Sequence, residues 1–157
     1  MAVYLVRHGV AVSRSDWGKP DLDDGRPLTK RGRRQADGLV ELLGRGDVRR
    51  LESSPTLRCL DTVRPLARTL GLDVEPIDEL REGVDSDVAA AVVRKAAAKK
   101  GDSVLCTHGD VVPEILRRLA ADGLRLPNEQ RWAKGSTWVL GWDGERFTDA
   151  RYLPPQA

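Results

Sequence analysis

The two histidines of this chain occupy matching positions. His8 follows a short apolar run in "YLVRHG", and His108 follows another in "VLCTHG", each with glycine next. Short apolar runs of this kind are typical of buried strands, and ligands of open α/β sheets bind beyond the carboxyl ends of the strands. A neutral imidazole can attack phosphorus and form a covalent intermediate. We therefore expect both rings at one catalytic site.

Two arginines are expected at the same site as the histidines. Arg7 directly precedes His8, and Arg58 lies about one turn into a helix expected after the strand at 48–53. Two fixed guanidiniums can hold a phosphate dianion by paired, charge-assisted hydrogen bonds, and helix N-termini add further donors. Nearby cations also lower the pKa of an imidazole and favour its nucleophilic form. The four side chains predict a phosphate pocket, with the glycines allowing close backbone approach to the ligand.

The elements that must position these residues alternate along the chain. Apolar patterning predicts strands at 3–6, 48–53, 72–77, 104–107, 137–142 and 146–152. Helices are expected after Thr29, from Pro55, after a cap at Ser86 or Asp87, and from Asp110. This order predicts an α/β three-layer sandwich with a mainly parallel central sheet and a C-terminal antiparallel hairpin. We expect one domain over residues 1–157.

Composition excludes several classes of protein. A net charge of +2 argues against a dedicated nucleic-acid binder, and no apolar run is long enough to cross a membrane. No signal peptide is visible at the N-terminus, and the two cysteines form neither a disulfide framework nor a zinc motif. These features predict a cytoplasmic protein with reduced thiols. No metal or other cofactor is expected, since an arginine beside His8 would repel a cation.

A set of motifs resembles a known family. "LVRHG", "RPLTKRGRRQA", "SSPTLRCLDT", "ELREG" and "CTHGD" follow one another over roughly residues 3–120. In this order they resemble the motifs of the histidine phosphatase superfamily, also called the phosphoglycerate-mutase-like or RHG family. The resemblance implies the phosphoglycerate-mutase-like fold and a phosphatase that needs no metal. It assigns the nucleophile to His8, the stabilisation of phosphoryl charge to His108, and phosphate binding to Arg7 and Arg58. Gly9 is expected to bind the phosphate as well, because a glycine lets the backbone approach it closely.

Three carboxylates are candidates for the proton donor. Glu82 in "LRE" is similar to the carboxylate with which the family protonates the leaving oxygen. Glu79 and Asp85 lie nearby as substitutes, and Glu82 could instead be a solvated loop residue. The sequence leaves these alternatives open.

The chain departs from the family at one position. Many members carry Ser or Thr two residues after the RHG glycine, where this chain has Ala11. Any extra phosphate contact must then come from elsewhere, with Ser13 and Arg14 as candidates. The polar segment 9–27 is long for a plain connection, and such loops are often functional. Trp17 within it could help to hold a base or could serve in packing.

The substrate is open between two classes. "RHGVA" and "RPLT" are similar to short bacterial phosphohistidine phosphatases that act on phosphorylated proteins. "KGSTWVL" resembles phosphatase domains that accompany Nudix domains and act on nucleotides, including oxidised guanine nucleotides. We therefore expect a nucleotide, another phosphorylated small molecule or a phosphoprotein as substrate, and a functional link to a Nudix protein. Nucleic acid and membrane are not expected partners. Alternatives are a catalytically weak phosphate-binding or nucleotide-binding module and, with least support, a sugar-acid phosphate mutase, because a pocket without a covering insertion favours hydrolysis.

Overall fold

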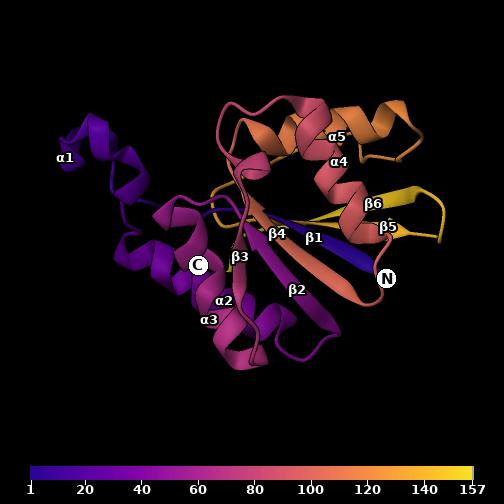
Figure 1. The fold of residues 1–157 in the computed structure, drawn as a ribbon, viewed down its shortest axis with the longest axis horizontal. Coiled ribbons are helices and arrows are strands. Elements are labelled where there is room, and N and C mark those ends of the chain that lie inside the picture. Colours follow the sequence, from indigo (N-terminus) through magenta and orange to yellow (C-terminus); the bar gives the residue numbers. More distant parts are fainter. Residues whose placement is uncertain (157) are drawn as a thin grey trace.

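The computed structural model describes residues 1–156. Along the chain, the strands and helices shown in Figure 1 are β1 (Ala2–Arg7), α1 (Arg14–Trp17), the 3₁₀ helix η1 (Pro20–Gly25), α2 (Lys30–Leu43), β2 (Val48–Ser53), α3 (Leu57–Leu70), β3 (Val74–Pro76), the 3₁₀ helix η2 (Asp78–Leu80), α4 (Ser86–Ala97), β4 (Asp102–Thr107), α5 (Val111–Ala121), β5 (Thr137–Trp142) and β6 (Phe147–Leu153).

The strands form one mixed sheet. Its order is β3-β2-β4-β1-β5-β6, with β1 to β4 parallel and β5 and β6 antiparallel to their neighbours. The expected fold class, including the C-terminal antiparallel pair, is confirmed. In the register of β1 and β4, Arg7 lies beside Thr107. His8 and His108 are each one residue further on, so both leave the sheet at the same edge.

Helices cover both faces of the sheet. Figure 1 shows α2 and α3 on one face and α4 and α5 on the other. Successive side chains of β1 point to opposite faces of the sheet. Val6 packs in a core with Leu39 and Val63, whereas Leu5 packs in a second core with Ile115. Burial of both faces explains why β1 and β4 read as nearly continuous apolar runs. In the described residues no helix is both long and apolar enough to span a bilayer.

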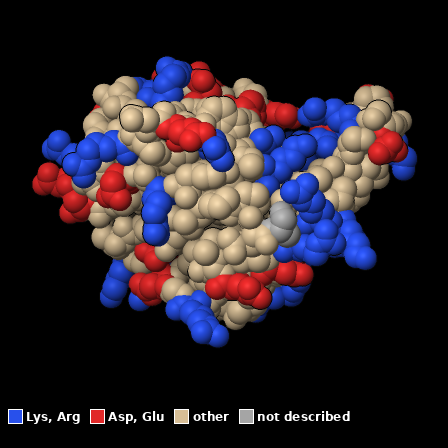
Figure 2. All heavy atoms as spheres, turned by 180° about the vertical axis from the view of Figure 1, so that it is seen from behind, with Lys and Arg blue, Asp and Glu red and all other residues tan. Residues whose placement is uncertain are grey.

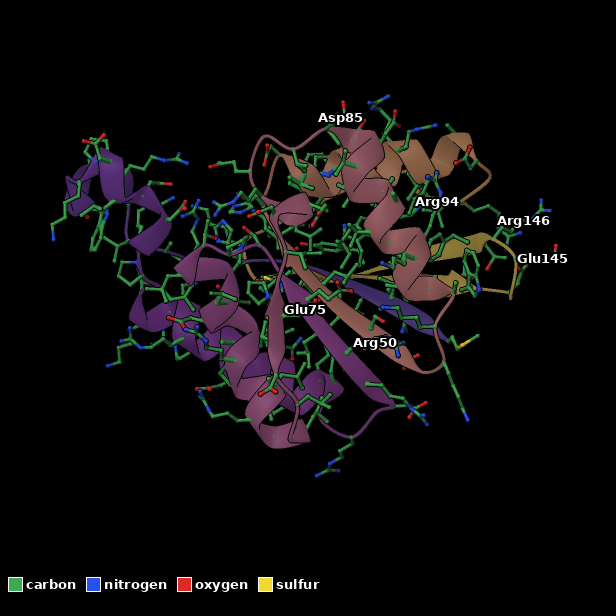
Figure 3. The ribbon with its side chains drawn as sticks, viewed as in Figure 1. Arg50, Glu75, Asp85, Arg94, Glu145 and Arg146 are labelled. Carbon is green, nitrogen blue, oxygen red and sulfur yellow. The ribbon has the colours of Figure 1, made fainter. Side chains whose placement is uncertain are left out.

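Two helix starts differ from the prediction by a residue or two. Thr29 caps α2 as expected, its hydroxyl oxygen accepting from the Gly32 N–H at 3.1 Å. Thr56 is the N-cap of α3, so Pro55 precedes the helix rather than beginning it. Asp85, labelled in Figure 3, caps α4 by accepting from the Asp87 N–H at 2.8 Å. A carboxylate one position earlier can satisfy the same helix N–H groups, which is why the pattern misplaced this cap.

The polar segment after β1 is more ordered than a plain loop. We call residues 13–25 the arm; it contains α1 and η1, in which no residue is buried. Its base is a short pairing in which Ala11 bridges Leu28 and the Val12 N–H donates to the Pro27 carbonyl at 2.8 Å. Figure 1 shows the arm projecting from the body of the molecule. The arm therefore begins and ends beside the sheet edge that carries His8.

Candidate active site

A pocket of about 200 Å³ opens at this edge of the sheet. Most of its charged side chains are basic, and Figure 2 shows Lys and Arg atoms gathered where the arm meets the body. Such a lining attracts anions. The residues that line the pocket are Arg7, His8, Ala11, Arg14, Arg26, Arg58, Glu82, Gly109, Asp110 and Lys134.

His8 is held as a neutral imidazole with one nitrogen engaged. Only 7% of the residue is exposed, and its Nδ1 lies 2.8 Å from the Gly9 carbonyl oxygen. Because a carbonyl can only accept, Nδ1 carries the proton and Nε2 keeps its lone pair. Burial lowers the pKa of His8 to about 4, and the charges of His108 and Arg58 lower it less. The predicted depression is therefore present, but desolvation rather than a neighbouring cation is its main cause.

His108 lies directly beside this ring. The two ring centroids are 5.4 Å apart in an edge-to-face arrangement, and His108 is 1% exposed. Its Nε2 is 2.8 Å from the Ser54 hydroxyl, whereas its buried Nδ1 has no hydrogen-bond partner among residues 1–156. Ser54 belongs to the "SSPT" motif, and no role for this serine was predicted from the sequence. It fixes the orientation of His108.

Arg7 lies against the backbone that follows His108. Its Nη1 donates to the Trp132 carbonyl at 2.7 Å. A Cβ atom on Gly109 would lie 2.5 Å from the Arg7 guanidinium carbon, so glycine makes room for this side chain. At Gly9 the crowding comes instead from α2, and the Gly9 N–H donates to the Thr62 hydroxyl at 2.9 Å. The space at these two glycines is thus taken by the protein, and the Gly9 N–H is already engaged.

Arg58 is the most deeply buried cation of the pocket. It lies in the first turn of α3 with 1% of its surface exposed. Its Nη1 donates to the Asp23 carbonyl of the arm at 3.0 Å. Its Nη2 lies 3.4 Å from an Asp23 carboxylate oxygen and 3.6 Å from one of Glu82. The Nε of Arg58 is buried and has no partner in the described residues, so one donor of this guanidinium is not engaged by the protein.

One of the three candidate proton donors reaches the pocket. Glu82 lines it and accepts from the Arg14 Nη2 at 3.2 Å. Glu79 lines a different hollow, beside β3, and Asp85 is engaged as the cap of α4. Asp110 also lines the pocket, and its carboxylate accepts from the Gly83 N–H at 2.8 Å. The "ELREG" and "CTHGD" motifs therefore each supply one carboxylate.

The arm residues singled out from the sequence occupy three different places. Arg14 lines the pocket, whereas Ser13 caps α1 by accepting from the Asp16 N–H at 3.2 Å. Trp17 lines an adjoining hollow of about 140 Å³ with Arg14, Pro20 and Asp23. The Trp17 Nε1 donates to the Leu22 carbonyl at 3.1 Å, and the Lys19 ammonium lies 4.6 Å from the ring centroid. Arg14 is common to the two hollows.

Two further cations of the pocket were not predicted. Arg26, 8% exposed, donates from Nη1 to the Val12 carbonyl at 2.8 Å and from Nε to Asp23 at 3.1 Å. It thereby joins the two ends of the arm. Lys134 precedes Gly135, whose N–H donates to the His8 carbonyl at 2.9 Å. The signals were present in "RPLT" and "KGSTWVL", which carry Arg26 and Lys134. Residues 1–156 bring no three His, Cys, Asp or Glu side chains together as a metal site.

Comparison with known proteins agrees with this geometry. Residues 3–88 match the model of the histidine phosphatase superfamily, branch 1. An 8-oxo-(d)GTP phosphatase of Mycolicibacterium smegmatis is 36% identical over 156 residues, which cover 98% of this chain and 48% of that protein. This chain thus spans about half the length of that relative.

Solved structures share the fold. The protein histidine phosphatase SixA in complex with tungstate aligns with a TM-score of 0.70 and 21% identity, covering 98% of this chain and 95% of that one. A mycobacterial glucosyl-3-phosphoglycerate phosphatase in complex with VO3 aligns with a TM-score of 0.69 and 21% identity, covering 99% of each chain. The motifs, the sheet order and the matched family model together establish that this chain belongs to branch 1 of the histidine phosphatase superfamily.

Proposed function

We propose that this chain hydrolyses phosphate esters or anhydrides through a phosphohistidine formed on His8. The observation that carries the proposal is the state of His8: a buried, neutral ring whose Nδ1–H is bound to the Gly9 carbonyl, in a pocket lined by arginines. A fixed Nε2 lone pair needs no base to become a nucleophile. Arg7 and Arg58 supply the charge that a bound phosphoryl group requires.

In the first step, the Nε2 lone pair of His8 forms a bond to phosphorus while the bond from phosphorus to the leaving oxygen breaks. The leaving oxygen takes a proton from Glu82, which lines the pocket. The ring gains positive charge as it becomes phosphorylated. The Gly9 carbonyl, 2.8 Å from Nδ1, stabilises that charge, and His108, whose ring lies beside that of His8, stabilises the phosphoryl oxygens.

In the second step, water attacks the phosphorus of the phosphohistidine. Glu82, now ionised, accepts the proton of the water, and the bond between nitrogen and phosphorus breaks. Orthophosphate leaves, and His8 regains its Nε2 lone pair. The Ala11 side chain can make no hydrogen bond to the phosphoryl group, so the extra cations Arg14 and Lys134 take the place of the side-chain hydroxyl found in many relatives.

The substrate that the site fits best is a nucleotide phosphate. Arg14 lines both the phosphate pocket and the hollow beside Trp17. A ligand whose phosphate lies in the pocket can therefore extend into that hollow. An indole offers a surface for a base, and arginine suits a second phosphate. The relative from Mycolicibacterium smegmatis, named for activity on 8-oxo-(d)GTP, supports this class. A phosphorylated protein is the second candidate, because the pocket meets the surface beside an exposed Glu82.

The proposal is tested by trapping the intermediate. The chain is mixed with a γ- or β-³²P-labelled guanine nucleotide and quenched in alkaline detergent, which preserves phosphohistidine. We expect label on His8, none in His8→Ala, and turnover of nucleoside di- or triphosphates above that of phosphohistidine peptides. Robust turnover by His8→Ala would exclude the covalent route. Faster turnover of the phosphohistidine peptide than of nucleotides would show that a phosphorylated protein is the substrate. Tight nucleotide binding without turnover would identify a binding module.

A further inference from the structure

Asp23 of the arm lies among three of the cations that line the pocket. One of its carboxylate oxygens is 3.1 Å from the Arg26 Nε and 3.4 Å from the Arg14 Nε. The other is 3.4 Å from the Arg58 Nη2. Asp23 itself lines the adjoining hollow, so its carboxylate approaches the three guanidiniums from the side of the arm. It is therefore a common partner of arginines that belong to α1, α3 and the base of the arm.

The contacts of Asp23 engage one part of the Arg58 guanidinium. The Asp23 backbone carbonyl accepts from Nη1 at 3.0 Å, and its carboxylate lies near Nη2. The Nε of Arg58 stays without a partner in the described part of the chain, although it is buried. A phosphate binds a guanidinium through two neighbouring N–H groups. Asp23 thus fixes the plane of Arg58 without engaging its Nε.

Charge gives Asp23 a second effect. Three guanidiniums held close together in a partly buried site repel one another. Partial burial raises the pKa of Asp23, but the hydrogen bond from Arg26 and the charges of Arg58, Arg26 and Arg14 bring it below its ordinary value. The carboxylate is therefore ionised at neutral pH. It offsets part of the repulsion and lets the arginines stay together before a phosphate arrives.

We propose that Asp23 is a positioning residue of the phosphate clamp, which consists of Arg7 and Arg58, and that it acts through Arg58. This inference rests on the proposed function. It makes the arm a part of phosphate binding itself, in addition to any contact that the arm makes with the rest of the substrate.

The first test is binding of inorganic orthophosphate, measured by calorimetry. We expect Asp23→Asn to bind phosphate about tenfold more weakly, the loss that follows when one charge-assisted hydrogen bond is misplaced. Asp24→Asn is the matched control, because Asp24 belongs to the same 3₁₀ helix but pairs with Arg81 at 2.9 Å. We expect the control to bind phosphate as the wild type does. Circular dichroism of each variant checks that the fold is intact.

The second test separates positioning from a general effect on the arm. With 4-nitrophenyl phosphate, kcat/KM is measured for Asp23→Asn in the wild-type chain and in an Arg58→Ala chain. If Asp23 acts through Arg58, the substitution lowers kcat/KM in the first and adds little in the second. Equal losses in both would overturn the inference, as would unchanged or tighter phosphate binding by Asp23→Asn. A wild-type chain that binds no phosphate would overturn the proposed function as well.

Discussion

The body and the arm meet at one pocket but hold their residues in different ways. His8, Arg58 and His108 are each less than a tenth exposed and leave strands or a helix that pack in the core. The arm contains no buried residue in α1 or η1, and its contacts with the pocket are hydrogen bonds and ion pairs. A packed core fixes geometry, whereas an exposed segment can change without unfolding the domain. We infer that the body carries the chemistry and the arm adjusts what is bound.

The largest expected effect comes from the body. His8→Ala removes the nucleophile, and we expect kcat/KM with 4-nitrophenyl phosphate to fall by at least about 10⁴-fold. His8→Gln is a second variant that keeps much of the ring's volume and limits any change in packing. Residual turnover near that of the wild type in either variant would show that the pocket does not use a phosphohistidine.

Arg58→Lys tests whether geometry or charge matters at the clamp. Lysine keeps the positive charge but cannot make two parallel hydrogen bonds to a phosphate. We expect a loss of about 10²-fold in kcat/KM, as for removal of one fixed donor to a developing charge. Arg64→Lys, on the exposed side of α3 and paired with Asp61, is the control. Equal activity of wild type and Arg58→Lys would mean that a point charge is sufficient.

The strand-end residues could be predicted from sequence because two simple rules place them. Continuous apolar runs indicate parallel strands, and parallel strands bring their carboxyl ends to one edge, so His8 and His108 had to meet. The role of Asp23 could not be predicted, because segment 9–27 has no periodicity to show which of its acidic residues turns inward. Asp110 lies at the expected start of α5, but its carboxylate binds Gly83 rather than the helix. An aspartate carboxylate can accept from the N–H groups at the start of a helix or from a loop N–H such as that of Gly83. The spacing of residues in the sequence therefore does not predict which donor it binds.

Glu82→Gln tests the proton donor. We expect kcat to fall by about 10²-fold for a nucleoside monophosphate, whose ribose oxygen leaves poorly without a proton, and much less for 4-nitrophenyl phosphate, whose phenolate leaves readily. Asp110→Asn provides the comparison, because both carboxylates line the pocket. Should Asp110→Asn instead show the difference between the two substrates, the acid would belong to the "THGD" motif and Glu82 would serve the arginines.

The protonation of His8 gives the body a pH signature. Because its pKa is about 4 in the folded chain, the ring stays neutral from pH 7 to about 5, and kcat/KM falls about tenfold per unit below pH 4. Unfolding restores the ordinary value of 6.5, so the unfolded chain binds the proton more tightly. Stability therefore decreases as pH falls from about 6.5 towards 4. Nitrogen NMR of labelled His8 measures the titration directly; a midpoint near 6.5 would contradict it.

The smallest expected effect belongs to the arm, and it has a different form. Trp17→Ala removes the indole beside Arg14, so we expect KM for a guanine nucleotide to rise by a few fold. Loss of a fully stacked base costs about 1–3 kcal/mol, which sets the upper limit of the effect. KM for 4-nitrophenyl phosphate and kcat for both substrates should change little, because the phosphate pocket keeps its residues. Ser13→Ala is the arm control, since the Ser13 hydroxyl caps α1 and contacts the Ser15 hydroxyl, and Ser13 lines neither the pocket nor the adjoining hollow. A loss shared by both substrates would instead assign Trp17 to packing within the arm, and Arg14 and Asp23 would then be the arm residues that contribute to binding.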